Sequence, residues 1–119
     1  MRLAVFGSRG FIDYERLCLG IANLGDTIEC IVSGGARGAD TLAARFAKEN
    51  GIKLFEFLPD YEKYGRSAPI VRNRSIVDNA DCVLAFWDGK SHGTKFVIEE
   101  CKKRRVPVQV FLNDSKKDK

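Results

Sequence analysis

The chain has 119 residues, of which 45% are hydrophobic and 30% are charged, and its formal net charge is +4. This length and composition are typical of one globular domain. No apolar run approaches the roughly 20 residues of a membrane-spanning helix, and residues 1–7 reach a glycine turn too early for a signal peptide. We therefore expect a cytoplasmic protein with no membrane partner.

Strand-forming and helix-forming segments alternate along the chain. Short runs rich in apolar and β-branched residues predict five strands, and apolar residues at helical spacing predict four helices between them. The strands are expected at residues 2–7, 28–33, 53–58, 81–87 and 106–112. The helices are expected at about residues 13–24, 39–50, 66–79 and 94–104.

This alternation predicts an α/β fold: a single Rossmann-like three-layer sandwich whose five-stranded, mainly parallel sheet carries helices on both faces. The domain is expected to span residues 1–112, and residues 113–119 are expected to form a polar, disordered tail. Residues 59–65 form the one long irregular loop that the pattern predicts. Ligands bind such open sheets at the carboxyl ends of the strands, so a site is expected in the loops that follow the first four strands.

The cysteines predict neither a disulfide framework nor a zinc site. Cys18, Cys30, Cys82 and Cys101 stand singly in apolar segments, whereas both kinds of site need paired spacing. Reduced thiols are therefore expected. The scattered aspartates also lack metal-ligand spacing, so no metal site and no cofactor are predicted, and Mg²⁺ is expected only as a companion of a diphosphate ligand.

Two glycine loops follow the first two strands and share the pattern GxRG, at residues 7–10 and 35–38. Glycines let a phosphate approach backbone N–H groups at a helix N-terminus, and each arginine adds a forked donor. Neither loop matches the Walker A or the GxGxxG fingerprint. Plain tight turns, with Asp40 as a carboxylate at the helix N-terminus, remain the alternative.

Two further segments belong to the expected site. After the fourth strand, Gly93 and Thr94 begin the last helix, next to His92, which is the only histidine; an incidental exposed histidine is the alternative to a catalytic one. In the helix at 66–79, Arg72 and Asn73 offer a phosphate fork and an amide, with a solvated helix face as the alternative.

The stretches GSRGFIDYERL, VSGGARGADTLAARFA, PDYEKYGRSAPIVRNRSI and ADCVLAFWDGKSHGT together resemble the SLOG superfamily, and within it the YspA/cpYpsA-related branch of small Rossmann-like proteins. The likeness covers about residues 3–111. It implies a binding or sensing domain for a nucleoside monophosphate or an NAD- or ADP-ribose-like ligand, and, by analogy with relatives, a homodimer. With Arg37 added from the loop pattern, the expected ligand-binding residues are Gly7, Ser8, Arg9, Gly34, Gly35, Arg37, Gly38, Asp40, Arg72, Asn73, Gly93 and Thr94. Tyr61, Tyr64 and Trp87 are the candidates for stacking on a base.

Relatives suggest two alternative functions. The LOG branch hydrolyses the N-glycosidic bond of nucleoside 5′-monophosphates and carries a glutamate in the pattern PGGxGTxxE, where this chain has Val97. If this chain is such a hydrolase, the catalytic candidates are Asp40, Arg72, Asp88 and Glu100. The DNA-processing protein A branch holds single-stranded DNA, which requires a basic groove; with a net charge of +4, nucleic-acid binding ranks third.

Overall fold

The computed structural model describes residues 1–25 and 27–112. The strands are β1 (Arg2–Gly7), β2 (Cys30–Ser33), β3 (Lys53–Glu56), β4 (Cys82–Trp87) and β5 (Val108–Leu112). The helices are α1 (Tyr14–Ala22), α2 (Ala39–Glu49), α3 (Tyr61–Tyr64), α4 (Ala68–Asp78) and α5 (His92–Arg104), with a 3₁₀ turn, η1 (Gly65–Ser67), before α4.

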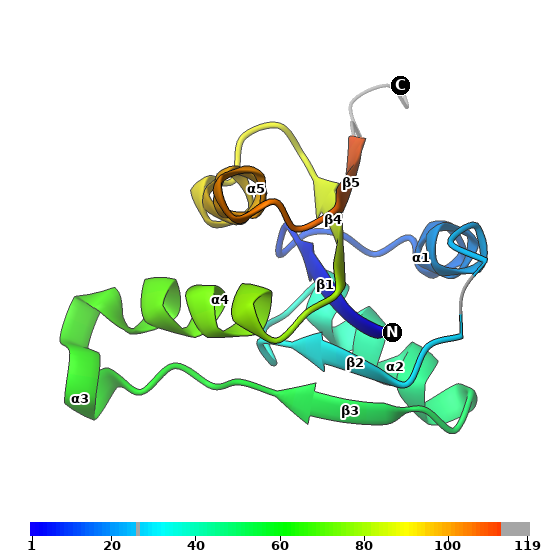
Figure 1. Ribbon diagram of the computed structural model, residues 1–119, viewed down its shortest axis with the longest axis horizontal. Coiled ribbons are helices and arrows are strands. Elements are labelled where there is room, and N and C mark those ends of the chain that lie inside the picture. Colours follow the sequence, from blue (N-terminus) through cyan, green and yellow to red (C-terminus); the bar gives the residue numbers. More distant parts are fainter. Residues whose placement is uncertain (26, 113–119) are drawn as a thin grey trace.

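The strands form one sheet in the order β3-β2-β1-β4-β5, and every neighbouring pair runs parallel (Figure 1). The chain builds outward from β1 to β3, then crosses back to β4 and β5. The strand order therefore reverses between β1 and β4, which is where an open parallel sheet forms its ligand crevice. The predicted Rossmann-like fold is confirmed, with a sheet that is wholly rather than mainly parallel.

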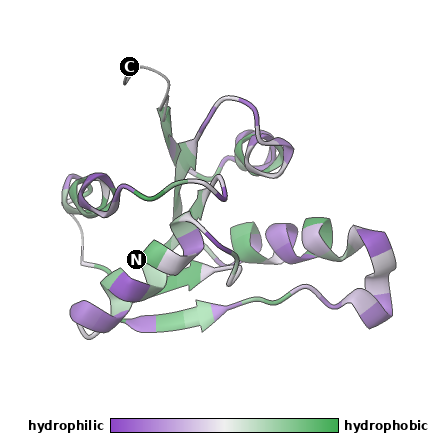
Figure 2. Ribbon diagram, turned by 180° about the vertical axis from the view of Figure 1, so that it is seen from behind, coloured by the Kyte–Doolittle hydropathy of each residue, from purple (hydrophilic) through white to green (hydrophobic). Residues whose placement is uncertain are grey.

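Two apolar clusters fill the space on the two faces of the sheet. On one face, Leu3, Val5 and Leu84 pack against α1 and α2; on the other, Ala4 and Val83 pack against α4 and α5. The middle strands β1 and β4 are buried along nearly their whole length, because helices cover both of their faces. Figure 2 shows the resulting hydrophobic colouring of the central strands and the hydrophilic outer faces of the helices.

The main departures from the predicted elements lie between β3 and α4. Residues 59–65, expected to be irregular, contain the single-turn helix α3, which forms because the Asp60 carboxylate accepts a hydrogen bond from the Lys63 N–H at 3.1 Å. We call residues 57–67 the arm, since they extend away from the sheet before α4 returns to it (Figure 1). Residues 60–67 are all exposed.

Smaller differences between the predicted and observed elements concern where strands and helices begin and end. Strands β2, β3 and β5 are shorter than expected, and α5 begins at His92 rather than at residue 94. The tail at 113–119 lies outside the described residues. Within residues 1–25 and 27–112, no disulfide joins any of the cysteines. No helix in these ranges has the length and apolar character needed to span a bilayer.

Candidate functional site

A cavity of about 490 Å³ lies at the carboxyl end of the sheet, where the strand order reverses. We call it the main cavity. Four segments form its walls: the loops after β1 and β2, the first half of α4, and the loop from β4 into α5. Its lining residues are Phe6, Gly7, Ser8, Arg9, Gly10, Ala36, Arg37, Asp40, Pro69, Arg72, Asn73, Asp88, Ser91, His92, Gly93 and Thr94.

Most of the predicted ligand-binding residues line the main cavity. Those that do are Gly7, Ser8, Arg9, Arg37, Asp40, Arg72, Asn73, Gly93 and Thr94. Three predicted glycines, Gly34, Gly35 and Gly38, do not line it. The lining also includes Ala36 and Pro69, which the sequence did not single out. Ala36 sits inside the second GxRG pattern, so that pattern was the available signal; Pro69 had none beyond its place at the start of a helix.

Gly34 lies directly against the side chain of Arg72. The Arg72 guanidinium lies against the Gly34 backbone, where a Cβ would come within 2.6 Å of Nη1. From there Nη1 donates to the Gly34 carbonyl at 2.7 Å, and Nε donates to the Asn73 amide oxygen at 2.8 Å. These bonds hold a cation on the cavity wall, which makes Gly34 a supporting residue for Arg72.

The two GxRG loops pack directly on each other. A Cβ on Gly38 would lie 2.3 Å from the Ser8 carbonyl oxygen, and one on Gly7 would lie 2.4 Å from the Ala39 Cβ. Gly38 also has a φ of 77° and a ψ of −125°, a backbone conformation that side-chain-bearing residues rarely adopt. The glycines of the motif therefore bring the loops, and with them Arg9 and Arg37, to one place.

Asp40 is the buried carboxyl of the main cavity, with a relative exposure of 8%. It lies in the first turn of α2, and its Oδ2 accepts a hydrogen bond from the Ala36 N–H at 3.0 Å. Burial raises the pKa of Asp40, although the hydrogen bond from Ala36 and the charge of Arg72 act in the opposite direction. A carboxyl group thus already occupies the N-terminal end of α2.

The N-terminus of α5 carries no acidic residue in its first turn. Its first residues, His92, Gly93 and Thr94, all line the main cavity. The N–H groups at a helix start have no partner inside the helix and favour an anion. The start of α5 therefore offers N–H groups to an anion, with the Asp88 carboxylate bound to the N–H of its N-cap, Ser91.

Asp88 organises its own loop. Its Oδ1 accepts hydrogen bonds from the N–H groups of Lys90 and Ser91, each at 2.8 Å, and Oδ2 accepts one from the Ser91 hydroxyl at 3.2 Å. The backbone bonds from Ser91 and Lys90 are the main causes that lower the pKa of Asp88. Ser8 joins this network, because its Oγ accepts from the Asp88 N–H and lies 3.1 Å from the Ser91 Oγ.

The predicted stacking residues lie outside the main cavity. Tyr61 is 60% exposed on the arm, and the 40% exposed Tyr64 lines a separate cavity of about 120 Å³. Trp87 is fixed by a hydrogen bond from its Nε1 to the Ser91 carbonyl at 3.0 Å. None of these three residues is among those that line the main cavity.

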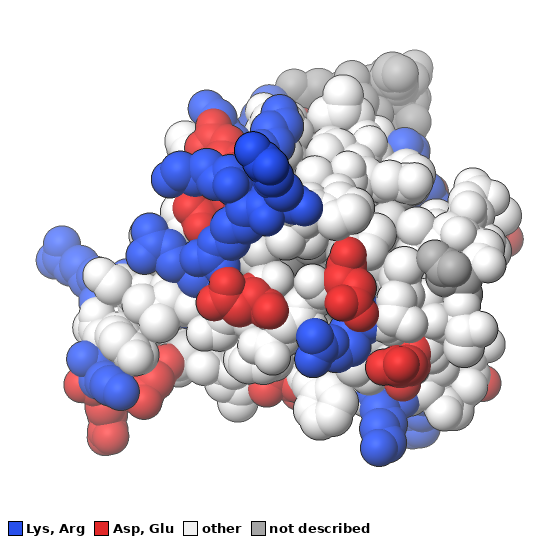
Figure 3. All heavy atoms as spheres, viewed as in Figure 1, with Lys and Arg blue, Asp and Glu red and all other residues white. Residues whose placement is uncertain are grey.

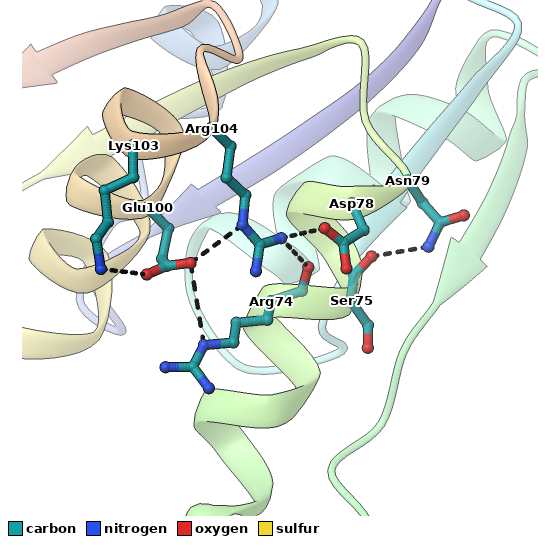
Figure 4. A network of polar contacts seen from close by, with 7 residues as sticks. All are labelled: Arg74, Ser75, Asp78, Asn79, Glu100, Lys103 and Arg104. Carbon is teal, nitrogen blue, oxygen red and sulfur yellow. Dashed lines mark hydrogen bonds and ion pairs between the residues drawn. The ribbon is translucent and has the colours of Figure 1, made fainter.

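Glu100 also lies outside the main cavity, within an ion network between α4 and α5 (Figure 4). It is 6% exposed, and its carboxylate lies 3.2 Å from Arg104 Nε, 3.8 Å from Lys103 Nζ and 3.9 Å from Arg74 Nε. Arg104 also pairs with Asp78 on α4. These contacts give Glu100 a structural role as the counter-ion that joins two helices.

Beside the main cavity lies an open depression of the surface, lined by Arg9, Gly35, Ala36, Arg37 and Thr41, all of which are exposed. It shares Arg9, Ala36 and Arg37 with the main cavity. Across the described ranges 1–25 and 27–112, no group of three or more His, Cys, Asp or Glu side chains is placed to hold a metal ion.

Comparison with known proteins gives two matches. The profile of the YspA, cpYpsA-related SLOG family matches residues 1–64, which include both GxRG loops and α2. The chain is 39% identical over 87 residues to the Gene 61 protein of Mycobacterium phage D29, in an alignment that covers 68% of this chain and 70% of the phage protein. No solved structure matches the chain.

Proposed function

The chain belongs to the YspA, cpYpsA-related SLOG family, and on that premise we propose that it is a binding or sensing domain for a nucleotide or nucleotide-derived ligand. The ligand is a nucleoside monophosphate or an NAD- or ADP-ribose-like molecule, held in the main cavity. The observation that carries this proposal is the convergence of Arg9, Arg37 and Arg72, from three different segments, on a cavity that also contains the first turn of α5.

The phosphate binds where positive charge and N–H donors coincide. The N-terminus of α5 supplies backbone N–H groups through Gly93 and Thr94, and Arg9 supplies a guanidinium from the loop after β1. Arg72 is already fixed by its bonds to Gly34 and Asn73, so it loses little side-chain entropy when it meets an anion.

The ribose lies toward Asp40. A carboxyl group accepts hydrogen bonds from sugar hydroxyls, whereas an ionised one repels a phosphate. The phosphate at α5 and the hydroxyls at Asp40 together set the direction in which a nucleotide enters.

Calorimetric titration with AMP, other nucleoside monophosphates, NAD and ADP-ribose tests this proposal. We expect one nucleotide to bind and inorganic phosphate alone to bind far more weakly. Arg72→Ala should weaken binding at least tenfold, because it removes a charge-assisted hydrogen bond. Arg66→Ala is the matched control, since Arg66 is exposed on η1 and does not line the cavity. Failure of every nucleotide to bind would overturn the proposal.

A second candidate function is hydrolysis of the N-glycosidic bond of nucleoside 5′-monophosphates. Asp40 favours it, because a buried carboxyl with a raised pKa suits a general acid that protonates the leaving base. The test is release of free base from AMP, followed by chromatography. Asp40→Asn should abolish release and Glu100→Gln should preserve it; binding without any release would rule out the hydrolase.

A further inference from the structure

Ser8 lies on the wall of the main cavity, is 6% exposed, and is held by hydrogen bonds to Asp88 and Ser91. Resting on the nucleotide-binding function proposed above, we infer that Ser8 determines specificity for the sugar: its hydroxyl presents an acceptor to the ligand and selects a ribose hydroxyl at that position. Asp88 and Ser91 are positioning residues in this role, because they act through Ser8 and set the direction of its proton.

Asp88 fixes the proton of Ser91. Hydrogen bonds from the N–H groups of Ser91 and Lys90 lower the pKa of Asp88, so its carboxylate is ionised at neutral pH and only accepts. Ser91 Oγ lies 3.2 Å from Asp88 Oδ2 and 3.1 Å from Ser8 Oγ, and its single proton can serve only one of them. A hydrogen bond to an ionised group is roughly twice as strong as one between neutral groups, so the Ser91 proton goes to Asp88.

Ser91 in turn fixes the proton of Ser8. Because the Ser91 proton is directed to Asp88, the 3.1 Å contact between the two hydroxyls is made by the Ser8 proton, which Ser91 Oγ accepts. Ser8 Oγ also accepts from the Asp88 N–H at 3.1 Å. A hydroxyl has one proton and two lone pairs, and no further group among residues 1–25 and 27–112 bonds to Ser8 Oγ. Ser8 therefore offers the cavity an acceptor and no donor.

An acceptor at this place favours a sugar hydroxyl over a phosphate oxygen. A ribose hydroxyl has a proton to donate, whereas an ionised phosphate oxygen only accepts, and two facing acceptors repel each other. The position of Ser8 agrees with this assignment, because its carbonyl packs on Gly38, two residues before the Asp40 that we place beside the ribose. Ser8 thus belongs to the sugar part of the site, although its loop also carries Arg9 for the phosphate.

Asp88→Asn should reverse the polarity of Ser8. The Asn oxygen still accepts from the N–H groups of Ser91 and Lys90, but an NH₂ group in place of Oδ2 donates to Ser91 Oγ. The Ser91 proton then goes to Ser8 Oγ, whose two lone pairs are both occupied, and the Ser8 proton is left for the cavity. Ser8 changes from acceptor to donor with no change in its own side chain.

Calorimetric titration with AMP, GMP, CMP and UMP, each compared with its 2′-fluoro and 3′-fluoro forms, tests the inference. Fluorine occupies about the space of a hydroxyl but has no proton to donate. For a ribonucleotide that binds the wild type, one of the two fluorine replacements should weaken binding about tenfold or more. Asp88→Asn should reduce this ratio to about threefold or less, because the donor that it creates at Ser8 tolerates fluorine.

Variants of Ser91 and Asp60 are the controls. Ser91→Ala interrupts the chain of hydrogen bonds and should also lower the ratio, whereas Ser91→Thr keeps the hydroxyl and should retain it. Asp60→Asn should retain the ratio as well, since Asp60 accepts a backbone N–H of its own loop but does not line the main cavity. The ratio is the informative quantity, because a loss of folded protein lowers the binding stoichiometry for both ligands alike.

The outcomes separate this inference from the function it rests on. If the ribonucleotide and both of its fluoro forms bind the wild type equally well, Ser8 does not select a hydroxyl, and the nucleotide site stands. If the ratio is the same in the wild type, Asp88→Asn and Ser91→Ala, the chain of hydrogen bonds does not set the polarity, and the inference is also wrong. If no ribonucleoside monophosphate binds, the inference fails; if NAD and ADP-ribose do not bind either, the proposed function fails with it.

Discussion

At the scale of single residues, Gly38 shows how the motif is held together. Gly38→Ala should lower the free energy of unfolding by about 3 kcal/mol or more, because a Cβ would meet the Ser8 carbonyl and the backbone has a φ of 77°. Urea denaturation followed by circular dichroism measures the loss.

Two other glycines separate the effect of the close contact at Gly38 from the effect of its positive φ. Gly25 has a φ of 69° but open space around a Cβ, so Gly25→Ala should cost only about 1–2 kcal/mol. Gly10 has open space and no positive φ, and Gly10→Ala should stay within about 0.5 kcal/mol of the wild type. Equal losses at Gly38 and Gly25 would contradict the close packing of the two loops.

Asp40 links the site to stability. Because burial raises its pKa in the folded protein, the folded state binds the proton more tightly than the unfolded state does. The stability of the protein should therefore fall as the pH rises from the ordinary aspartate value of 3.8 through the raised folded value.

Asp40→Asn should remove this pH dependence and leave the protein at least as stable as the wild type at pH 7, since an amide oxygen still accepts from Ala36. Thermal unfolding across pH 4 to 7 measures the difference. Glu62→Gln, at an exposed position of α3, is the control that should retain the wild-type slope. If Asp40→Asn is less stable than the wild type at every pH, the ionised Asp40 carboxylate does not destabilise the folded protein, and the prediction is wrong.

At the scale of the elements, the contact between α4 and α5 depends on Glu100. Glu100→Gln should lower the free energy of unfolding by about 1–2 kcal/mol, because the nearly buried carboxylate neutralises Arg104, which itself pairs with Asp78 on α4, and lies 3.9 Å from Arg74 Nε on α4. Lys103→Met should cost less than about 0.5 kcal/mol, since Lys103 is 76% exposed and water screens its charge. A double-mutant cycle between Glu100 and Arg74, which lies on α4, measures the coupling between the two helices, and a coupling near zero would contradict this role.

The element pattern predicted the fold well, because buried parallel strands leave a strong periodic signal. The site was harder to predict. The pattern placed Arg9 and Arg37 at one edge of the sheet, since parallel strands end together, and in the structure both line the main cavity with Arg72 of α4. It gave no means of distinguishing Gly38, which spaces two loops, from a glycine that touches a ligand, because that depends on contacts between segments 30 residues apart.

The positions of the aromatic candidates and of Glu100 were also beyond what the sequence pattern could predict. Tyr61 and Tyr64 follow β3 closely in sequence, but the arm carries them away from the cavity (Figure 1). Glu100 lies only six residues after Thr94, yet six residues of helix are a distance of about 9 Å along the axis. Such placements follow from tertiary structure and leave no local pattern.

At the scale of the whole molecule, charge is unevenly distributed. Lys and Arg side chains gather over α5 (Figure 3), whose last turn carries Lys102, Lys103 and Arg104. Glu100 and Asp78 offset part of this charge.

The third hypothesis, binding of single-stranded nucleic acid, predicts a steep loss of oligonucleotide affinity with salt. The homodimer expected by analogy also stays a prediction, which sedimentation equilibrium would test.

The arm should be the first internal site of proteolysis. Residues 60–67 are all exposed and are held by a single helical turn, so they open locally at little cost. Limited trypsin digestion should cut first after Lys63 or Arg66, and the two fragments should stay associated through the sheet. Intact-mass analysis identifies the cut; a first internal cut after Arg9 or Arg37 would contradict the prediction.

The packing of Gly38 on Ser8 also limits how the protein can change. Because the loops after β1 and β2 touch through their backbones, a substitution in one is constrained by the shape of the other. The other two walls are formed by side chains of α4, such as Arg72 and Asn73, and by the N-terminal end of α5. New ligand preferences are therefore most accessible to evolution, and to protein engineering, from the α4 and α5 side.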